Sequence, residues 1–137
     1  MTEHSKEIII NASQGILGRI ASFAAKQALL GKNVVIVNCA HALITGRPRS
    51  VIKEYIELRR RGGSSLKGPF FPKHPERILK RTVRGMLPHL QQRGIDALKR
   101  VRCYDYLPLE FESAQFISFP TSTLAKTMSL AELSREI

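Results

Sequence analysis

Two β-branched runs separated by an amphipathic segment constrain the fold of this chain more than any other feature. The runs occupy residues 7–11 and 34–38, and both have the composition of buried strands. Between them, apolar residues recur at helical spacing from Leu17 to Leu29, and Gly31 follows where a helix would end. A connection of this length usually joins parallel neighbours. The first third of the chain therefore predicts a strand, a helix and a strand of a layered α/β domain.

The middle of the chain continues this alternation. A third apolar segment at residues 42–45 ends at Gly46, and Pro48 marks the start of a second helix. A third helix is expected to begin near Pro75 and to end before Pro88. The apolar residues that this helix is expected to bury are Ile78, Leu79, Val83, Met86 and Leu87.

The remaining segments are shorter. Turn-forming residues dominate 62–72, which predicts a long loop, and a short helix at about 91–99 precedes a strand at 101–104. The tail 107–137 is expected to be irregular until Ser129, where a capping box opens a last helix. We therefore expect a single domain over residues 1–137, with a three-layer α/β/α architecture around a small, mainly parallel sheet of about four strands.

Positive charge is concentrated in the middle of the chain. The 137 residues include 22 Lys and Arg against 11 Asp and Glu, a net charge of +11. Residues 47–102 hold 16 of the basic residues and four acidic ones, whereas residues 1–46 are nearly neutral and residues 103–137 are mildly acidic. A basic region within an otherwise ordinary globular sequence indicates a polyanion partner, with nucleic acid ahead of an anionic membrane.

The predicted third helix carries a basic face. Its four central members stand at i, i+3, i+4 and i+7, and two residues extend the stripe towards the N-terminus: Arg77, Lys80, Arg81 and Arg84, with Lys73 and His74. Like-charge pairs four residues apart destabilise a helix by roughly 0.2 to 0.5 kcal/mol each. A helix face that only contacts solvent would therefore be more stable with both positive and negative side chains. The spacing therefore favours a phosphate-binding face.

The run Arg59-Arg60-Arg61 has two open interpretations. Cations at a helix C-terminus are favoured by the helix dipole, so charge alone does not separate helix capping from phosphate contact. The adjoining loop, with Lys67 and Lys73, favours phosphate contact, because a basic loop can follow an irregular phosphate path. Phe70 and Phe71 could stack on unpaired bases, although core burial of at least one of them, which would anchor the loop to the domain, is the stronger expectation.

Signals for catalysis, cofactors and metals are weak. The Gly15-Ile16-Leu17-Gly18 turn lacks the dinucleotide and phosphate-loop patterns, and a tight strand-to-helix turn explains it best. Its G-x-x-G spacing also matches the nucleotide-clamping loop of KH domains, but here a strand precedes it. Cys39 and Cys103 lie 64 positions apart, which favours buried free thiols in a reducing compartment over a disulfide framework or a metal site. The chain also lacks a signal segment and a long apolar stretch. We expect a cytoplasmic non-enzyme without catalytic residues, metal, cofactor or small-molecule substrate.

A series of motifs across about residues 7–108 occurs in the order typical of one family. The motifs include LGRIAS at 17–22, VIVN at 35–38, KGPFFP at 67–72, TVRGMLP at 82–88 and VRCY at 101–104. On these residues the chain resembles the universal large-subunit ribosomal protein family thirteen, in its archaeal and eukaryotic branch. The ending LAEL at 130–133 resembles archaeal members. The family usually has an aliphatic residue where Cys103 stands.

This resemblance implies a structural component of the large ribosomal subunit, which binds large-subunit ribosomal RNA, supports its assembly and touches neighbouring ribosomal proteins. The residues expected to make the principal RNA contacts are Arg61, Lys67, Lys73, Arg77, Lys80, Arg81 and Arg84, with His74 on the same stripe. A second group is expected to contribute less: Arg47, Arg49, Arg59, Arg60, Lys99, Arg100 and Arg102.

Three other functions stay open at this point. The first is a free-standing RNA-binding translational regulator, which would use the same basic face. The second is a small nucleotide-dependent enzyme built on the turn at residues 15–18. The third, a membrane-surface role, is disfavoured because the basic face lacks exposed aromatic anchors.

Overall fold

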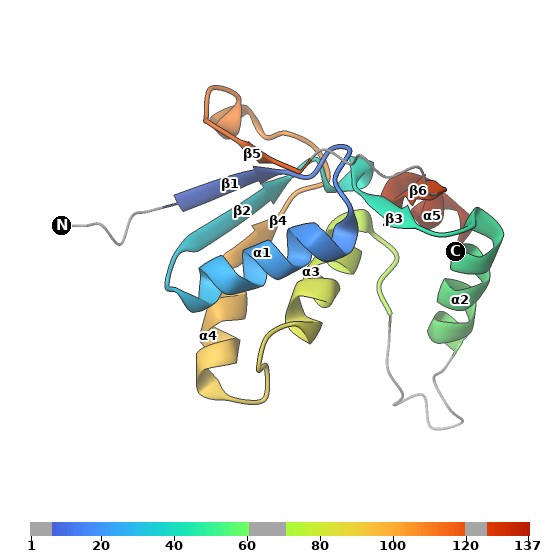
Figure 1. The fold of residues 1–137 in the computed structure, drawn as a ribbon, viewed down its shortest axis with the longest axis horizontal. Coiled ribbons are helices and arrows are strands. Elements are labelled where there is room, and N and C mark those ends of the chain that lie inside the picture. The colour runs from blue at the N-terminus through green and yellow to red at the C-terminus, as the bar shows by residue number, and fades with distance from the viewer. Residues whose placement is uncertain (1–6, 61–70, 120–125) are drawn as a thin grey trace.

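The computed structural model describes residues 7–60, 71–119 and 126–137 (Figure 1). These residues form five helices, six short strands and two single turns of 3₁₀ helix, at Cys39–His41 and Leu109–Phe111. The helices are α1 (Leu17–Leu29), α2 (Pro48–Arg60), α3 (Pro75–Gly85), α4 (Gln92–Lys99) and α5 (Leu130–Glu136). The strands are β1 (Glu7–Asn11), β2 (Asn33–Val37), β3 (Leu43–Thr45), β4 (Val101–Cys103), β5 (Ile117–Ser118) and β6 (Thr127–Ser129).

The main sheet has four parallel strands in the order β4-β2-β1-β5. Strand β1 lies beside β2 with Ile8 opposite Val34, and β2 lies beside β4 with Val35 opposite Arg102. The predicted strand, helix and strand at the start of the chain are thus confirmed, and Gly31, with a φ of +94°, lies just past the end of α1. The α/β class and the mainly parallel sheet of four strands are also confirmed.

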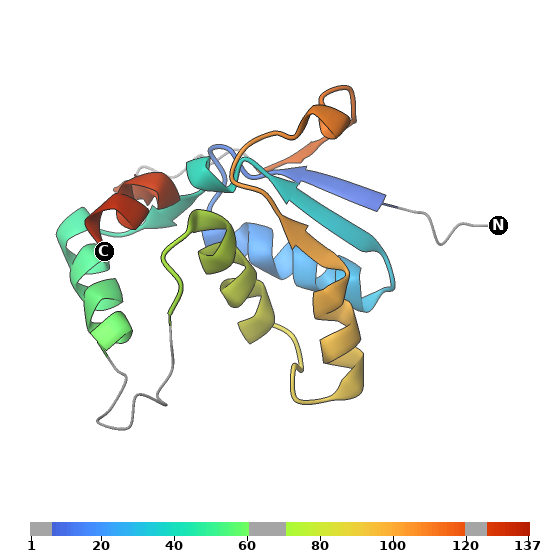
Figure 2. The same cartoon turned by 180° about the vertical axis from the view of Figure 1, so that it is seen from behind.

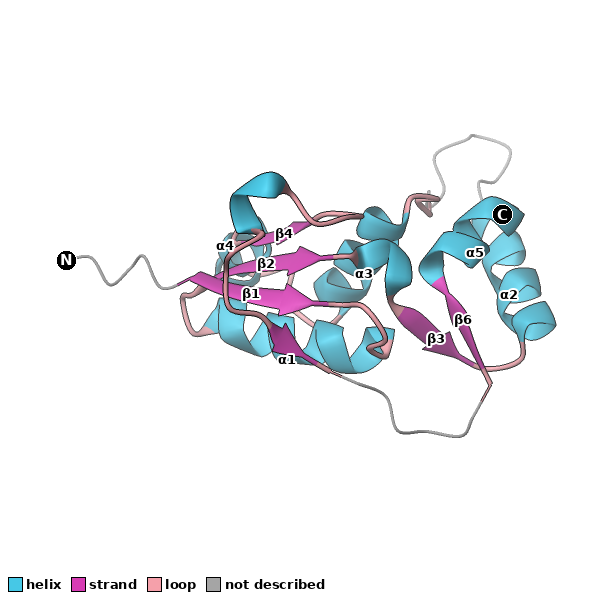
Figure 3. Cartoon of the chain, turned by 90° about the horizontal axis from the view of Figure 1, so that it is seen from above, coloured by secondary structure: helices cyan, strands magenta, loops and turns pink. Residues whose placement is uncertain are grey.

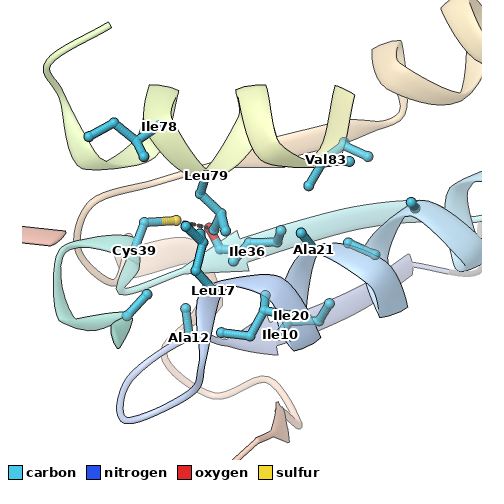
Figure 4. Packing of buried hydrophobic residues seen from close by; sticks show 14 of the residues in the cluster. Ile10, Ala12, Leu17, Ile20, Ala21, Ile36, Cys39, Ile78, Leu79 and Val83 are labelled. Carbon is cyan, nitrogen blue, oxygen red and sulfur yellow. Dashed lines mark hydrogen bonds between the residues drawn. The ribbon is translucent and has the colours of Figure 1, made fainter. Parts of the chain in front are cut away.

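Alternation along the strands divides the apolar residues between the two faces of the sheet. Ile10 and Ile36 lie in the larger core, where they pack with α1 and α3, and Figure 4 shows Leu79 of α3 above Ile36. Val35 and Val37 face the other side, where Phe111 covers them. The layer on this second face is an irregular segment with one 3₁₀ turn, because residues 107–116 lack a helical apolar period.

The tail holds two strands where the sequence predicted irregular structure. Strand β5 pairs with β1 at one edge of the main sheet, and β6 pairs antiparallel with β3 in a separate two-stranded sheet. Figure 3 shows this small sheet beside the main one, next to α2 and α5. Strands of two or three residues are too short to show a period, and pairing with distant segments stabilises them. The expectation of an irregular tail before Ser129 was therefore wrong.

Helix α3 ends earlier than the sequence predicted. Its last residue is Gly85, and Met86 follows as the capping residue with 45% of its surface exposed. The prediction that Met86 is buried was wrong, because the chain leaves the helical period at this point. The other four predicted core residues of the segment are buried: Ile78, Leu79, Val83 and Leu87.

Helix α5 begins as its capping box predicts. The Ser129 hydroxyl accepts a hydrogen bond from the backbone N–H of Glu132 at 3.2 Å. Leu130 and Leu133 are buried, and Ile137 packs against the same core. The short last helix thereby closes over the two-stranded sheet and completes the core.

The N-terminus of α3 is capped by a carboxylate that is distant in sequence. Asp105 Oδ1 accepts a hydrogen bond from the backbone N–H of Glu76 at 2.9 Å, and its negative charge favours the positive end of the helix dipole. We expect Asp105→Ala to lower the free energy of unfolding by about 1 to 2 kcal/mol in urea denaturation. Asp96→Ala is the control, because Asp96 accepts only an exposed hydrogen bond from the Gln92 side chain, worth roughly 0.5 kcal/mol or less. Equal losses of unfolding free energy in the two variants would show that the Asp105 cap of α3 does not stabilise the fold.

Candidate nucleic-acid interface

Helix α3 separates its apolar and basic residues onto opposite faces. Ile78, Leu79 and Val83 are buried against the core, whereas Arg77 and Arg84 are exposed. Lys80 and Arg81 are half-buried beside them. No carboxylate among the described residues lies within ion-pair distance of these four side chains. The structure thus gathers the predicted stripe into one positively charged face.

Two surface grooves share this face. The first, called the α3 groove below, is lined by Pro72, Arg77, Lys80, Arg81, Arg84 and Leu98. The second, called the β4 groove, runs between α3 and the edge strand and is lined by Glu76, Arg77, Lys80, Arg102, Cys103 and Tyr104. Arg77 and Lys80 belong to both grooves. Figure 2 shows β4 at the edge of the sheet beside α3, so the basic surface continues from the helix to the sheet edge.

Arg102 has a partner within the fold. Its guanidinium Nη2 lies 3.5 Å from Glu7 Oε2, and the side chains of Arg102 and Glu7 are 57% and 35% exposed. An exposed ion pair of this kind contributes little to stability, on the order of 0 to 1 kcal/mol. Arg102 can therefore exchange Glu7 for a phosphate at little cost.

Phe71 is held between α2 and α3 by contacts with an arginine from each helix. The Arg81 guanidinium carbon lies 4.1 Å from the centre of the Phe71 ring, and Arg59 Nε donates a hydrogen bond to the Phe71 carbonyl at 3.3 Å. Phe71 is half-buried and lines a pocket between α2 and α3 together with Tyr55 and Ile78. The predicted core burial is not seen at Phe71, which is half-buried and lies outside the core clusters, while Phe70 lies outside the described residues. Arg81 and Arg59 thus position the loop end, in addition to any contact with RNA.

Tyr55 completes this contact between the helices. Burial raises the pKa of its hydroxyl above the ordinary value, and the neighbouring Glu54 charge adds to the shift. The hydroxyl is therefore neutral at pH 7. Tyr55 itself therefore adds no negative charge beside the basic face.

Helix α2 carries a second cluster of cations. Arg49, Lys53 and Arg60 line a groove on its outer side together with Ile52, Ile56 and Glu57. Lys53 was missing from the predicted set, although its position four residues after Arg49 indicates a shared face. Arg47 and Arg49 flank the start of the helix, where the first turn holds no acidic residue and a cation is unfavourable. An anionic partner would relieve this repulsion.

The other predicted residues differ in their surroundings. Lys73 and Lys99 are exposed, and the exposed His74 precedes α3 without capping it through its side chain. Arg100 Nη1 donates a hydrogen bond to the Ala28 carbonyl at 2.9 Å, at the C-terminal end of α1, so this guanidinium has a structural role. Arg61 and Lys67 lie outside the described residues.

The turn before α1 packs tightly. A Cβ at Gly15 would lie 2.7 Å from Ile20 Cδ1 and 3.1 Å from the Phe119 carbonyl oxygen, so the fold itself fills the space beside this glycine. A Cβ at Gly18 would meet nothing within 4 Å. Close packing of a strand-to-helix turn explains Gly15 without a bound nucleotide.

Two other kinds of site find no support in the described part of the chain. Residues 7–60, 71–119 and 126–137 contain no group of three or more His, Cys, Asp or Glu placed to hold a metal ion. None of the helices described is long and apolar enough to cross a membrane.

Comparison with known proteins supports the resemblance seen in the sequence. Residues 5–108 match the family model described as ribosomal protein L13. The large ribosomal subunit protein uL13 of Archaeoglobus fulgidus is 45% identical over 133 residues, covering 93% of this chain and 85% of that protein. The uL13 proteins of Methanosarcina barkeri and Haloarcula marismortui are 42% and 43% identical over 135 and 104 residues. These alignments cover 94% and 76% of this chain, and 96% and 70% of the respective relatives.

Proposed function

Because the chain belongs to the ribosomal protein L13 family, we propose that it is a structural component of the large ribosomal subunit that binds ribosomal RNA and supports its assembly. It is not an enzyme, and its partners are ribosomal RNA and other ribosomal proteins. The observation that carries this function is the basic face of α3, where four cations line two connected grooves. We place the protein in the cytoplasmic large subunit.

The proposed mechanism is electrostatic. Phosphates of neighbouring RNA segments repel one another, and arginine and lysine side chains placed between them reduce that repulsion. Arginine adds paired hydrogen bonds to phosphate oxygens, which fix the direction of approach. Three cations of α3 have no assigned internal role and would make the principal contacts: Arg77, Lys80 and Arg84.

The rest of the proposed contact surface surrounds α3. Lys73 and His74 extend its stripe, Arg81 adds charge beside Phe71, and the loop residues Arg61 and Lys67 complete the principal set. The secondary contacts are proposed at Arg47, Arg49, Lys53, Arg59, Arg60, Lys99, Arg100 and Arg102. Their order of importance follows from exposure and from the internal partners of Arg59, Arg100 and Arg102.

We also propose that residues 1–137 form one domain, in which different regions contact RNA and neighbouring proteins. A single buried cluster unites residues of the main sheet, α1, α3 and α5, which supports one folding unit. Residues 47–102 would face RNA. The neutral start and the acidic tail 107–137 would meet neighbouring ribosomal proteins, and the exposed Leu109 on the tail suits such a contact.

Sedimentation tests the proposed function against a role outside the ribosome. In a sucrose gradient of the source-cell lysate, we expect the protein to sediment with large subunits and to remain there after a high-salt wash. An assembled component is held by many buried contacts, whereas a loosely bound factor depends on screened charges. Recovery of the protein only in the light fractions would contradict the proposal and favour a free-standing RNA-binding regulator.

A further inference from the structure

The two cysteines of the chain meet at the carboxyl ends of adjacent parallel strands. Cys39 follows β2, and Cys103 is the last residue of β4. The Cys39 N–H donates to the Tyr104 carbonyl at 3.0 Å, and the Tyr104 N–H donates to the Ile36 carbonyl at 2.8 Å. Ile36 is in turn the register partner of Cys103. Backbone hydrogen bonds thus hold the two residues side by side although 64 positions separate them in the sequence.

Both side chains lie on the helix-covered face of the sheet. Cys39 belongs to the core cluster that includes Leu79 of α3, and Cys103 packs against this cluster. Figure 4 shows the Cys39 sulfur below that helix. Cys39 Sγ donates a hydrogen bond to the Ile36 carbonyl at 3.6 Å. The nearby Cys103 side chain, together with burial, raises the pKa of Cys39. The backbone pairing and the shared face of the sheet make the two thiols neighbours beneath α3.

The two thiols differ in their access to solvent. Cys39 is completely buried, whereas Cys103 is half-buried and lines the β4 groove beside Arg77, Lys80 and Arg102. These three cations outnumber the one carboxylate of the groove, Glu76, so its net positive charge attracts an anionic reagent towards the Cys103 sulfur. An accessible thiol next to a buried one is the arrangement that a two-step exchange with an external disulfide requires.

We propose that Cys39 and Cys103 form a reversible dithiol–disulfide pair, oxidised through the β4 groove by a small anionic disulfide such as oxidised glutathione. This inference goes beyond RNA binding and does not depend on it. The bond would tie the carboxyl ends of β2 and β4 together beneath α3, next to the basic face.

The proposed exchange has two balanced steps. Cys103 gives its proton to solvent, and its thiolate attacks one sulfur of the external disulfide, which breaks that bond and releases one glutathione thiolate. Cys39 then gives up its proton and attacks the Cys103 sulfur, which releases the second glutathione. Two protein thiols are oxidised and one external disulfide is reduced to two thiols. The second step is the slower one, because Cys39 is a weak acid in its buried position.

The test uses the full chain and oxidised glutathione, followed by unfolding, alkylation of the remaining thiols and intact-mass measurement. We expect the wild-type protein to lose both alkylatable thiols without retaining glutathione. We expect Cys39→Ala to retain one glutathione on Cys103, and Cys103→Ser to keep an unmodified Cys39 because that thiol is buried. Oxidation should raise the Tm of the wild type alone, and a reducing agent should reverse the change.

Three results would overturn the proposal: a stable glutathione adduct on the wild type, two unreacted thiols at every glutathione ratio, or a covalent dimer. A wild-type time course keeps the test independent of whether Cys39→Ala folds. The mixed disulfide on Cys103 should rise first and then disappear as the internal bond forms. Loss of both thiols without that intermediate would contradict the proposed order of steps.

Discussion

Replacing Arg77, Lys80 and Arg84 by glutamine is expected to weaken the affinity of the isolated protein for a large-subunit ribosomal RNA fragment by on the order of 100-fold. Each contacted phosphate contributes roughly 0.7 to 0.9 to the slope of log affinity against log salt, so the slope should fall by about 2 to 3. Arg81 stays unchanged in this variant because its guanidinium stacks on Phe71. The measurement is a binding titration at several salt concentrations.

The matched control removes the same charge elsewhere. Arg19, Lys26 and Lys126 are exposed and lie outside the basic region, so their replacement by glutamine lowers the net charge equally. We expect this control to change the salt slope by less than about 1, because only long-range attraction is lost. Equal losses of affinity in the two triple variants would show that total charge, and not the α3 face, governs binding. Thermal unfolding should confirm that both variants fold.

Gly94→Ala is expected to destabilise the fold by about 3 kcal/mol or more, or to prevent folding altogether. A Cβ at Gly94 would lie 1.9 Å from the Pro88 carbonyl oxygen and 2.3 Å from its carbon, and both atoms belong to the backbone. The Gln91 N–H donates to that same oxygen at 2.9 Å, and the Gly94 N–H donates to the Gln91 carbonyl at 3.1 Å. These hydrogen bonds hold the corner between α3 and α4, so the clash cannot be relieved by a rotamer change.

Urea denaturation measures this effect, and Gly85→Ala supplies the control. A Cβ at Gly85 would meet nothing within 4 Å, and alanine is the better helix former by about 1 kcal/mol. We therefore expect Gly85→Ala to leave stability unchanged or slightly increased. If Gly94→Ala had the same unfolding midpoint as the wild type, this result would contradict the predicted clash between residue 94 and the Pro88 backbone.

Local periodicity made much of this protein predictable. The helical spacing between residues 17 and 29 and the β-branched runs beside it led directly to α1, β1 and β2. The basic face of α3 was predictable for the same reason, because helix geometry alone places Arg77, Lys80, Arg81 and Arg84 together. The resemblance to a ribosomal protein family rested on motif order, and comparison with whole proteins confirmed it.

Contacts between distant segments escaped prediction. The short strands β5 and β6 exist through pairing with β1 and β3, and Asp105 caps a helix that begins 30 positions earlier in the sequence. The hydrogen bond from Arg100 to the Ala28 carbonyl gives this residue a structural role that the sequence did not reveal, beside its proposed RNA contact. Neither composition nor spacing reveals such partners, because each depends on how the layers pack.

A density map of the assembled large subunit tests the central claim, that the α3 face binds ribosomal RNA, most directly. The expected map places the side-chain nitrogens of Arg77, Lys80 and Arg84 within about 4 Å of phosphate oxygens, the range of an ion pair. It also places RNA density along the α3 groove. A map in which this face lies in solvent, or packs against another protein while RNA runs elsewhere on the molecule, would contradict the claim.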